Sequence, residues 1–135
     1  MNTAEVRQHF ENNDFFAKYL GINLVKVAVD EGIAVMPFDE RHRNGMDNVH
    51  GAAIFALADT AFAASANASG ILCVNAQTSI SYVAPGRVGP LRGVSRPLRL
   101  GRKIVIYEVT ITDGADTLVA KATVTGYIVG LELKK

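Results

Sequence analysis

One segment constrains the fold more than any other, the run NVHGAAIFALADTAFAASA from Asn48 to Ala66, which is almost wholly apolar and contains a single charged residue, Asp59. Its many alanines favour a helix, which we expect from about Val49 to Ser69 with Gly70 as its C-terminal cap. Because apolar residues occupy nearly every side of this helix, other elements should cover most of it. A membrane span does not fit, because an acid lies at the centre and no basic residues flank the segment.

The rest of the chain predicts an antiparallel sheet around this helix. An N-terminal helix is expected over residues 3–19, with Thr3 as its candidate N-cap and Gly21 as its stop, followed by a hairpin of residues 22–29 and 33–38. Four more strand-like runs cover residues 72–83, 90–100, 103–112 and 117–130. The predicted fold class is therefore α+β, a six-stranded antiparallel sheet curled around one long helix. The 135 residues suit a single domain, with the N-terminal helix in residues 1–20 and the core in residues 21–130.

The first strand after the central helix alternates in a way that predicts its two faces. One face would carry Val74, Ala76, Thr78, Ile80 and Tyr82, and the other Asn75, Gln77, Ser79 and Ser81.

The net charge of +1 conceals an uneven distribution. No acid occurs between Thr60 and Tyr107, where the basic residues are Arg87, Arg92, Arg96, Arg99, Arg102 and Lys103. On charge alone, solvated arginines at strand ends are the simpler interpretation, and a site for a phosphate-bearing ligand is the alternative. Nucleic acid is not expected as a partner, because a basic domain with interleaved aromatic residues is missing.

Cysteine and histidine usage predicts neither a disulfide nor a metal site. The single cysteine, Cys73, follows an apolar pair and is expected to be a buried, unreactive thiol. His9, His42 and His50 lack metal-ligand spacing. The N-terminal residues do not resemble a signal peptide, so we expect a cytoplasmic protein.

Asp59 and the pair His50-Gly51 are the candidates for chemistry. A buried carboxylate needs a partner or a role, and on sequence grounds a structural and a catalytic role for Asp59 are equally supported. His50 and Gly51 lie at the helix N-terminus, where free N–H groups can stabilise an oxyanion. Nine residues of helix separate His50 from Asp59 by roughly 13 Å. If both act on one small group, Asp59 must come from a second subunit, which predicts a dimer.

Several motifs together resemble the PaaI-like hotdog-fold thioesterases. The segment HGAAIFALAD is similar to that family's helix signature, and TSISYVAPGRVG, RLGRKIVIYEVTITD and LVAKATVTGYI continue the likeness in the same order. The resemblance implies the hotdog fold, in which a curved sheet wraps a central helix. It also implies homodimers, often paired into homotetramers, with active sites at the dimer interface. One residue departs from the signature, since Ala52 replaces its second glycine.

The resemblance also implies roles for individual residues. Asp59 would attack the thioester or activate water, Gly51 would polarise the thioester carbonyl, and His50 would orient that region. Asn44 would position water or the thioester, and Asn75 would hold the nucleophilic water. The coenzyme A nucleotide would contact Arg99, Gly101, Arg102 and Lys103.

Three functions follow for comparison. An acyl-CoA thioesterase is the first, needing no cofactor beyond water, with Phe55, Phe62 and Met46 as expected walls of the acyl cleft. A hotdog hydratase or dehydratase ranks last of the three, because this sequence lacks the His-Phe-Pro-like segment of that class. A non-catalytic acyl-CoA-binding or scaffold protein lies between them. The acyl group is left open, and so is the choice between coenzyme A and a carrier protein.

Overall fold

The computed structural model describes residues 1–134 and shows one curved sheet wrapped around a helix. Two short helices, α1 (Thr3–Asn13) and α2 (Phe15–Tyr19), come first, followed by strands β1 (Asn23–Lys26) and β2 (Gly32–Met36) and a 3-10 turn, η1 (Glu40–His42). The central helix α3 (Gly51–Ala66) precedes strands β3 (Ile71–Tyr82), β4 (Leu91–Leu100), β5 (Ile104–Thr112) and β6 (Leu118–Glu132). The predicted α+β class and the six strands are confirmed.

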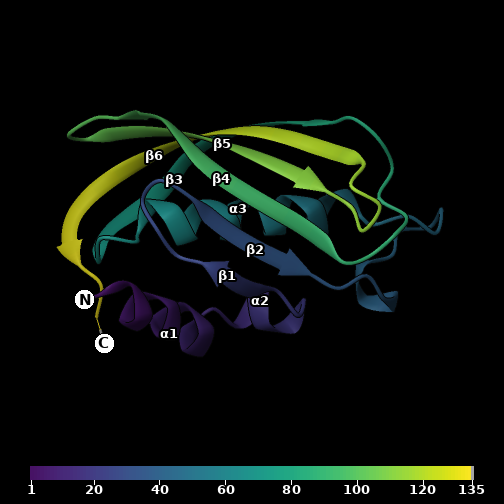
Figure 1. The fold of residues 1–135 in the computed structure, drawn as a ribbon, viewed down its shortest axis with the longest axis horizontal. Coiled ribbons are helices and arrows are strands. Elements are labelled where there is room, and N and C mark those ends of the chain that lie inside the picture. The colour runs from purple at the N-terminus through teal and green to yellow at the C-terminus, as the bar shows by residue number, and fades with distance from the viewer. Residues whose placement is uncertain (135) are drawn as a thin grey trace.

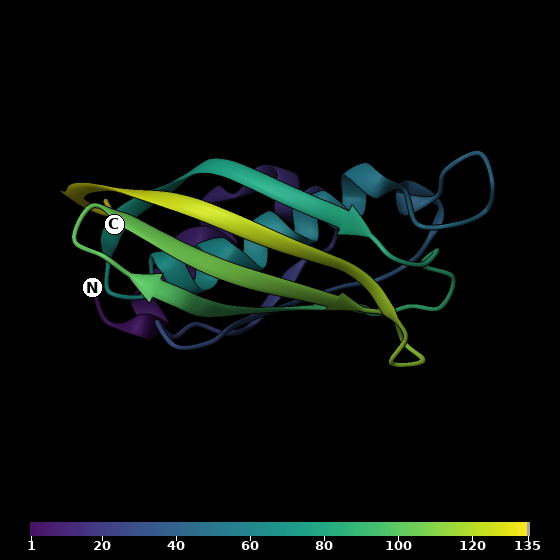
Figure 2. The ribbon, with the colours of Figure 1, turned by 90° about the horizontal axis from the view of Figure 1, so that it is seen from above.

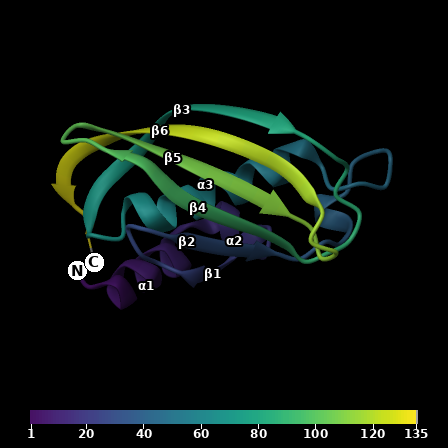
Figure 3. The same ribbon diagram turned by 45° about the horizontal axis from the view of Figure 1, so that its top comes forward.

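The sheet is antiparallel, with the strand order β1-β2-β4-β5-β6-β3. The strands arch over α3, while α1 and α2 lie on the opposite side of that helix (Figure 1). The view from above shows the long strands crossing over α3 (Figure 2), and the tilted view shows β3 as one edge of the sheet (Figure 3). This arrangement covers the sheet-facing side of α3 and leaves β3 with one unpaired edge.

Small residues let α3 pack close against the sheet. A Cβ atom on Gly32 would lie 2.5 Å from the carbonyl oxygen of Ala61, so only glycine fits there without a backbone shift. Ser65 and Ser95 share a buried hydrogen bond of 2.8 Å that joins α3 to β4. Phe62 is buried edge-to-face against Tyr107, with ring centroids 5.7 Å apart. The alanine-rich composition therefore reflects a close helix–sheet contact.

The expected N-terminal helix is in fact two helices, and although α1 begins at Thr3 as predicted, Thr3 is not its N-cap. Asn2, not Thr3, caps α1, because its Oδ1 accepts from the Glu5 N–H at 2.9 Å. Asp14 divides the helices: its N–H ends α1 by donating to the Phe10 carbonyl, and its side chain starts α2 by accepting from the Ala17 N–H at 3.1 Å. A capping side chain inside the predicted helix thus redirects the chain.

The central helix is shorter than predicted at both ends. It begins at Gly51, with His50 as its N-cap, and ends at Ala66, with Asn67 as its C-cap. Asn67 ends the helix because its side chain donates to the Ala63 carbonyl and accepts from the Cys73 N–H. Gly70 has a positive φ of 86° and belongs to the turn into β3 instead of capping the helix.

A bulge in β3 changes which side chains face the helix. The pairing with β6 shifts register between Asn75 and Gln77, so that Ala76 is an extra residue. The prediction that Val74 and Ala76 share a face with Thr78 is wrong, because the bulge brings Asn75 and Thr78 to the helix side together. Both side chains there hydrogen-bond to one another, and Asn75 also reaches α3.

Among residues 1–134, none of the helices combines the length and the apolar character that a membrane span requires.

Candidate active site

The N-terminus of α3 offers one free backbone donor. The His50 carbonyl accepts from the N–H groups of Ala53 and Ile54, and its ring Nδ1 accepts from the Ala52 N–H at 3.0 Å. Within the described residues, nothing accepts the Gly51 N–H. The His50 ring thus occupies the Ala52 N–H, which leaves the Gly51 N–H as the donor that a ligand can use at this terminus.

The loop before α3 is held in place by a buried histidine. His42 Nδ1 accepts from the Asp39 N–H at 3.0 Å, so Nε2 carries the proton and donates to the Leu20 carbonyl at 2.6 Å. The His42 carbonyl in turn accepts the His50 N–H at 2.6 Å. This chain of contacts fixes the position of His50 relative to the end of α2.

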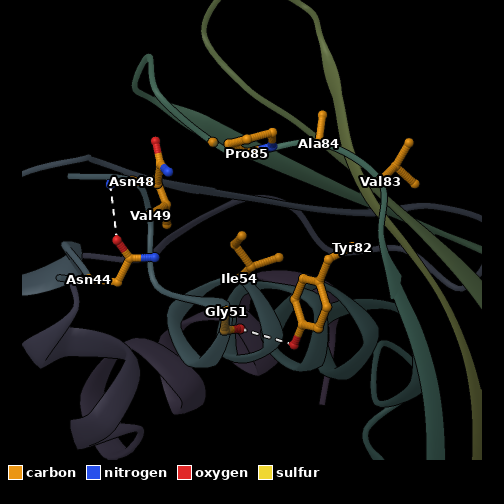
Figure 4. A pocket seen from close by; sticks show the side chains of 10 residues that line it. Asn44, Asn48, Val49, Gly51, Ile54, Tyr82, Val83, Ala84 and Pro85 are labelled. Atoms are coloured by element: carbon orange, nitrogen blue, oxygen red, sulfur yellow. Dashed lines mark hydrogen bonds between the residues drawn. The ribbon is translucent and has the colours of Figure 1, made fainter. Parts of the chain in front are cut away.

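The side-chain oxygen of Asn44 accepts hydrogen bonds within its own loop, and its amide nitrogen points toward α3. Its Oδ1 accepts from the N–H groups of Met46, at 2.8 Å, and Asn48, at 3.1 Å. The amide nitrogen is left to point into a pocket in front of Gly51 (Figure 4). The structure thus brings Asn44 and Gly51 together, with His50 between them in the chain.

This pocket has a volume of about 300 Å³ and opens at the N-terminus of α3. Its lining residues are Asn44, Asn48, Val49, Gly51, Ile54 and the segment Tyr82, Val83, Ala84, Pro85 and Gly86. The Tyr82 hydroxyl donates to the Gly51 carbonyl at 3.2 Å, and the ring lies against the Gly51 backbone (Figure 4). Sequence reasoning missed Tyr82, although it quoted the strand and turn that carry it.

Asp59 lies about two turns further along α3 and is exposed, not buried. The sheet covers only one side of the helix, and the uncovered stripe consists of Ala52, Phe55 and Asp59. The expectation that other elements cover most of this helix is confirmed, but the expectation that Asp59 is buried is wrong, because Asp59 lies on the uncovered stripe. A solvent-facing carboxylate in an apolar stripe fits a surface that another group covers.

Asn75 of β3 holds the Asp59 carboxylate, and Thr78 of the same strand holds Asn75. Asn75 Nδ2 donates to Asp59 Oδ1 at 2.8 Å, and the Thr78 hydroxyl donates to Asn75 Oδ1 at 2.9 Å. Because a carboxylate only accepts, the amide nitrogen of Asn75 must face Asp59. Asn75 is therefore next to the candidate catalytic carboxylate, and Thr78 is a neighbour that the unbulged alternation placed on the opposite face from Asn75.

Asp59 also borders a groove of about 350 Å³ between α2 and α3. Its lining residues are Asp14, Phe16, Ala17, Ala52, Phe55, Ala56, Asp59 and Thr60. Of the three expected cleft walls, only Phe55 lines it, because Phe62 is buried in the core and Met46 projects from the loop at 80% exposure. Phe16 also lines the groove, and no pattern in the sequence linked it to Asp59.

Gly51 and Asp59 lie too far apart to act on one small group within a single chain. Eight residues of helix separate Gly51 from Asp59, which corresponds to roughly 12 Å along the axis. Each group borders a different cavity.

The basic residues divide into those paired within the chain and those left open to solvent. Arg96 donates to Glu31 at 2.9 Å, and Arg87 donates to Asn48 Oδ1 at 3.3 Å beside the Gly51 pocket. The exposed side chains of Arg99, Arg102 and Lys103 surround the β4–β5 turn with Gly101. This turn lies at the opposite end of the molecule from the loop that precedes α3 (Figure 1).

Metal binding and thiol chemistry are the other candidate activities to consider. In residues 1–134, no group of three or more His, Cys, Asp or Glu side chains is placed to hold a metal ion. Cys73 is buried, and this burial raises the pKa of its thiol, which keeps it protonated and unreactive at neutral pH.

Comparisons with known proteins agree with this geometry. The family model described as Thioesterase superfamily matches residues 46–120. Acyl-coenzyme A thioesterase PaaI from Escherichia coli K12 is 34% identical over 111 residues, which cover 80% of this chain and 78% of that protein. The solved structure of E. coli PaaI matches with a TM-score of 0.92 and 26% identity, over 98% of this chain and 96% of that one. A Streptococcus mutans UA159 protein bound to acetyl CoA matches with a TM-score of 0.77 and 27% identity, over 83% of this chain and 91% of that one.

Proposed function

Because the chain belongs to the thioesterase superfamily and has its hotdog fold, we propose that it hydrolyses acyl-coenzyme A thioesters at sites shared between two subunits. The observation that carries this proposal is the Asp59 carboxylate, exposed on an apolar stripe of α3 and held through one oxygen by Asn75. Its other oxygen is left to act on a substrate. The acyl-CoA substrate is supported by the name of the E. coli relative and by the acetyl CoA in the S. mutans structure.

A homodimer formed through β3 would complete the site. The twelve residues of β3 have one unpaired edge, and an open edge of that length favours pairing with another strand. Asn75 at one part of β3 contacts Asp59, and Tyr82 at its end contacts Gly51. Antiparallel pairing of two β3 strands brings the Tyr82 end of one subunit toward the Asn75 end of the other. Asp59 of one subunit then approaches Gly51 of its partner, and two such dimers could form a tetramer.

The reaction in such a site needs the thioester and water. The Gly51 N–H donates to the thioester carbonyl oxygen and stabilises the negative charge that develops there. Asp59 of the other subunit either attacks the carbonyl carbon or removes a proton from the attacking water. The C–S bond breaks, the coenzyme A thiolate leaves and takes up a proton, and the acid is released; in the nucleophilic route, water first cleaves the acyl–Asp59 anhydride.

The remaining residues have supporting roles. His50 fixes the first turn of α3 through its bond from the Ala52 N–H, and the Asn44 amide donates to the thioester or to water. We assign Asn75 to holding Asp59 instead of holding water, since its amide nitrogen already faces that carboxylate. The open cations around the β4–β5 turn, with Gly101, are proposed to bind the coenzyme A phosphates: Arg99, Arg102 and Lys103.

The test of the activity is release of free thiol from a panel of acyl-CoA thioesters. Wild-type protein should release thiol, and Asp59→Asn should lower kcat by on the order of 10²–10⁴, the usual contribution of a general base. The matched control is Asp116→Asn, the same chemical change in an exposed turn whose positive φ of 62° suits asparagine. Equal rates for wild type and Asp59→Asn would exclude Asp59 from the mechanism. Binding of coenzyme A without thiol release would favour a binding protein instead.

Mixed dimers test whether the site is shared. Gly51→Pro removes the proposed donor, yet proline suits the first position of a helix, and the His50 ψ of 136° suits a residue before proline. A dimer of one Asp59→Asn subunit and one Gly51→Pro subunit contains one intact site if the site is shared, and none if each chain has its own. Random mixing of equal amounts makes about half of the dimers mixed, each with one of its two sites intact, so recovery of about a quarter of the wild-type rate is expected. No recovery would contradict the shared site.

A further inference from the structure

The groove between α2 and α3 is lined by aromatic and small apolar residues, as ligand-binding sites are, and no role has yet been assigned to it. Phe16 and Phe55 face it from the two helices, and Ala52 and Ala56 line it between them. Its volume of about 350 Å³ is within the range of small-molecule sites. Asp59 borders the same groove, so a group bound there lies beside the proposed reacting carboxylate.

Helix α2 is anchored firmly although its aromatic residues are exposed. Ala17 and Leu20 are buried, and the carbonyl groups at the end of the helix accept from Arg41, at 2.6 Å to Tyr19, and from His42, at 2.6 Å to Leu20. Phe16 nevertheless remains 65% exposed. An aromatic side chain kept at the solvent by a fixed helix suits contact with a ligand more than packing within the chain.

The charge of the groove is negative. Asp14 and Asp59 both line it, and none of its lining residues is basic. Lys18, the one basic residue of α2, instead has its Nζ over the Phe15 ring, at 5.4 Å from the centroid. An acyl group that carries its own carboxylate would meet two like charges in this groove and no cation.

We propose that the α2–α3 groove binds the acyl group of the substrate, that Phe16 sets its apolar contact, and that Asp14 excludes acyl groups bearing a negative charge. The inference rests on the proposed thioesterase activity. The substrate class is therefore thioesters of uncharged acyl groups, and α2 is the element that determines the selectivity.

The charge part of the proposal is tested with butyryl-CoA and succinyl-CoA, which have the same number of acyl carbons and differ by a carboxylate. Wild type should prefer butyryl-CoA, and Asp14→Asn should raise the succinyl-to-butyryl ratio of kcat/KM by about tenfold, as expected for removing one charge near another. Asparagine keeps the N-cap of α2, so the helix is preserved. An unchanged ratio in folded Asp14→Asn would overturn the charge filter.

The apolar part is tested with phenylacetyl-CoA and acetyl-CoA. Phe16→Ala should lower the phenylacetyl-to-acetyl ratio of kcat/KM by about tenfold, because it removes part of an aromatic contact surface. Phe15→Ala is the matched control, since Phe15 is equally exposed on α2 but does not line the groove. The same effect in both variants, or in neither, would overturn the assignment of Phe16. Thiol release with unaltered selectivity rejects the groove alone, whereas no release by wild type from any thioester rejects the proposed function as well.

Discussion

Replacing Asn75 with alanine removes the one side-chain hydrogen bond that Asp59 receives within residues 1–134. A hydrogen bond to a charged group contributes about 1.5–3 kcal/mol, and water can replace part of it at an exposed carboxylate, so about 1.5 kcal/mol is the appropriate estimate here. If this bond orients Asp59 for the chemical step, kcat should fall about tenfold. KM should change little, because Asn75 contacts Asp59 and not the substrate.

The assay is thiol release with kcat and KM measured separately, and it is accompanied by a check that each variant is folded. Thr78→Val keeps the side-chain shape but removes the hydroxyl that fixes the Asn75 amide, so a smaller fall in kcat is expected. Asn75→Asp replaces the donor with a second carboxylate and should reduce kcat more than alanine does. Ser79→Ala, in the same strand but facing away from α3, is the control. A kcat for Asn75→Ala within twofold of wild type would refute the positioning role.

Two further predictions concern stability. Hydrogen bonds from the side chain and backbone of Arg41 lower the pKa of Asp39 from its ordinary 3.8 to about 2, so its ionised form stabilises the fold above about pH 4 and this stabilisation is lost as the pH falls toward 2. Asp39→Asn should therefore show a smaller drop in urea midpoint between pH 5 and pH 2.5 than wild type, and an equal drop would contradict this account. Gly32→Ala should lower the unfolding free energy by about 1–3 kcal/mol, because the new methyl group would overlap the Ala61 carbonyl. Gly45→Ala, where a Cβ meets nothing within 4 Å, is its control, and equal urea midpoints for the two variants would refute the overlap.

The sequence predicted the elements of the fold because their signals are local. Alternation of apolar residues marks strands, and the dense alanine run marks a helix that must pack closely. Its ends were misjudged by a few residues because capping depends on side-chain bonds, such as those of Asn67. The break at Asp14 was missed for the same reason, because an aspartate inside a helical pattern has no visible capping role until its partner is known.

The candidate site was recognised in part. A lone acid in an apolar helix and a His-Gly pair at its start are anomalies that local sequence reveals, and helix geometry alone indicated that Asp59 and His50 are too far apart to share a site in one chain. The solvent exposure of Asp59 could not be predicted, because the sheet covers only one side of α3 and apolar composition does not tell a core face from a face left for a partner.

By itself, then, the sequence determined the α+β architecture, the family resemblance and the separation of Asp59 from His50 and Gly51, since each follows from order, periodicity and rise per residue. Only the tertiary structure decided that a bulge turns Asn75 and Thr78 toward Asp59, that Phe16 borders the same groove, and that the His50 ring occupies the Ala52 N–H. These contacts join residues through strand register, helix packing and side-chain direction. Such relations depend on where distant segments meet, and local sequence patterns do not encode them.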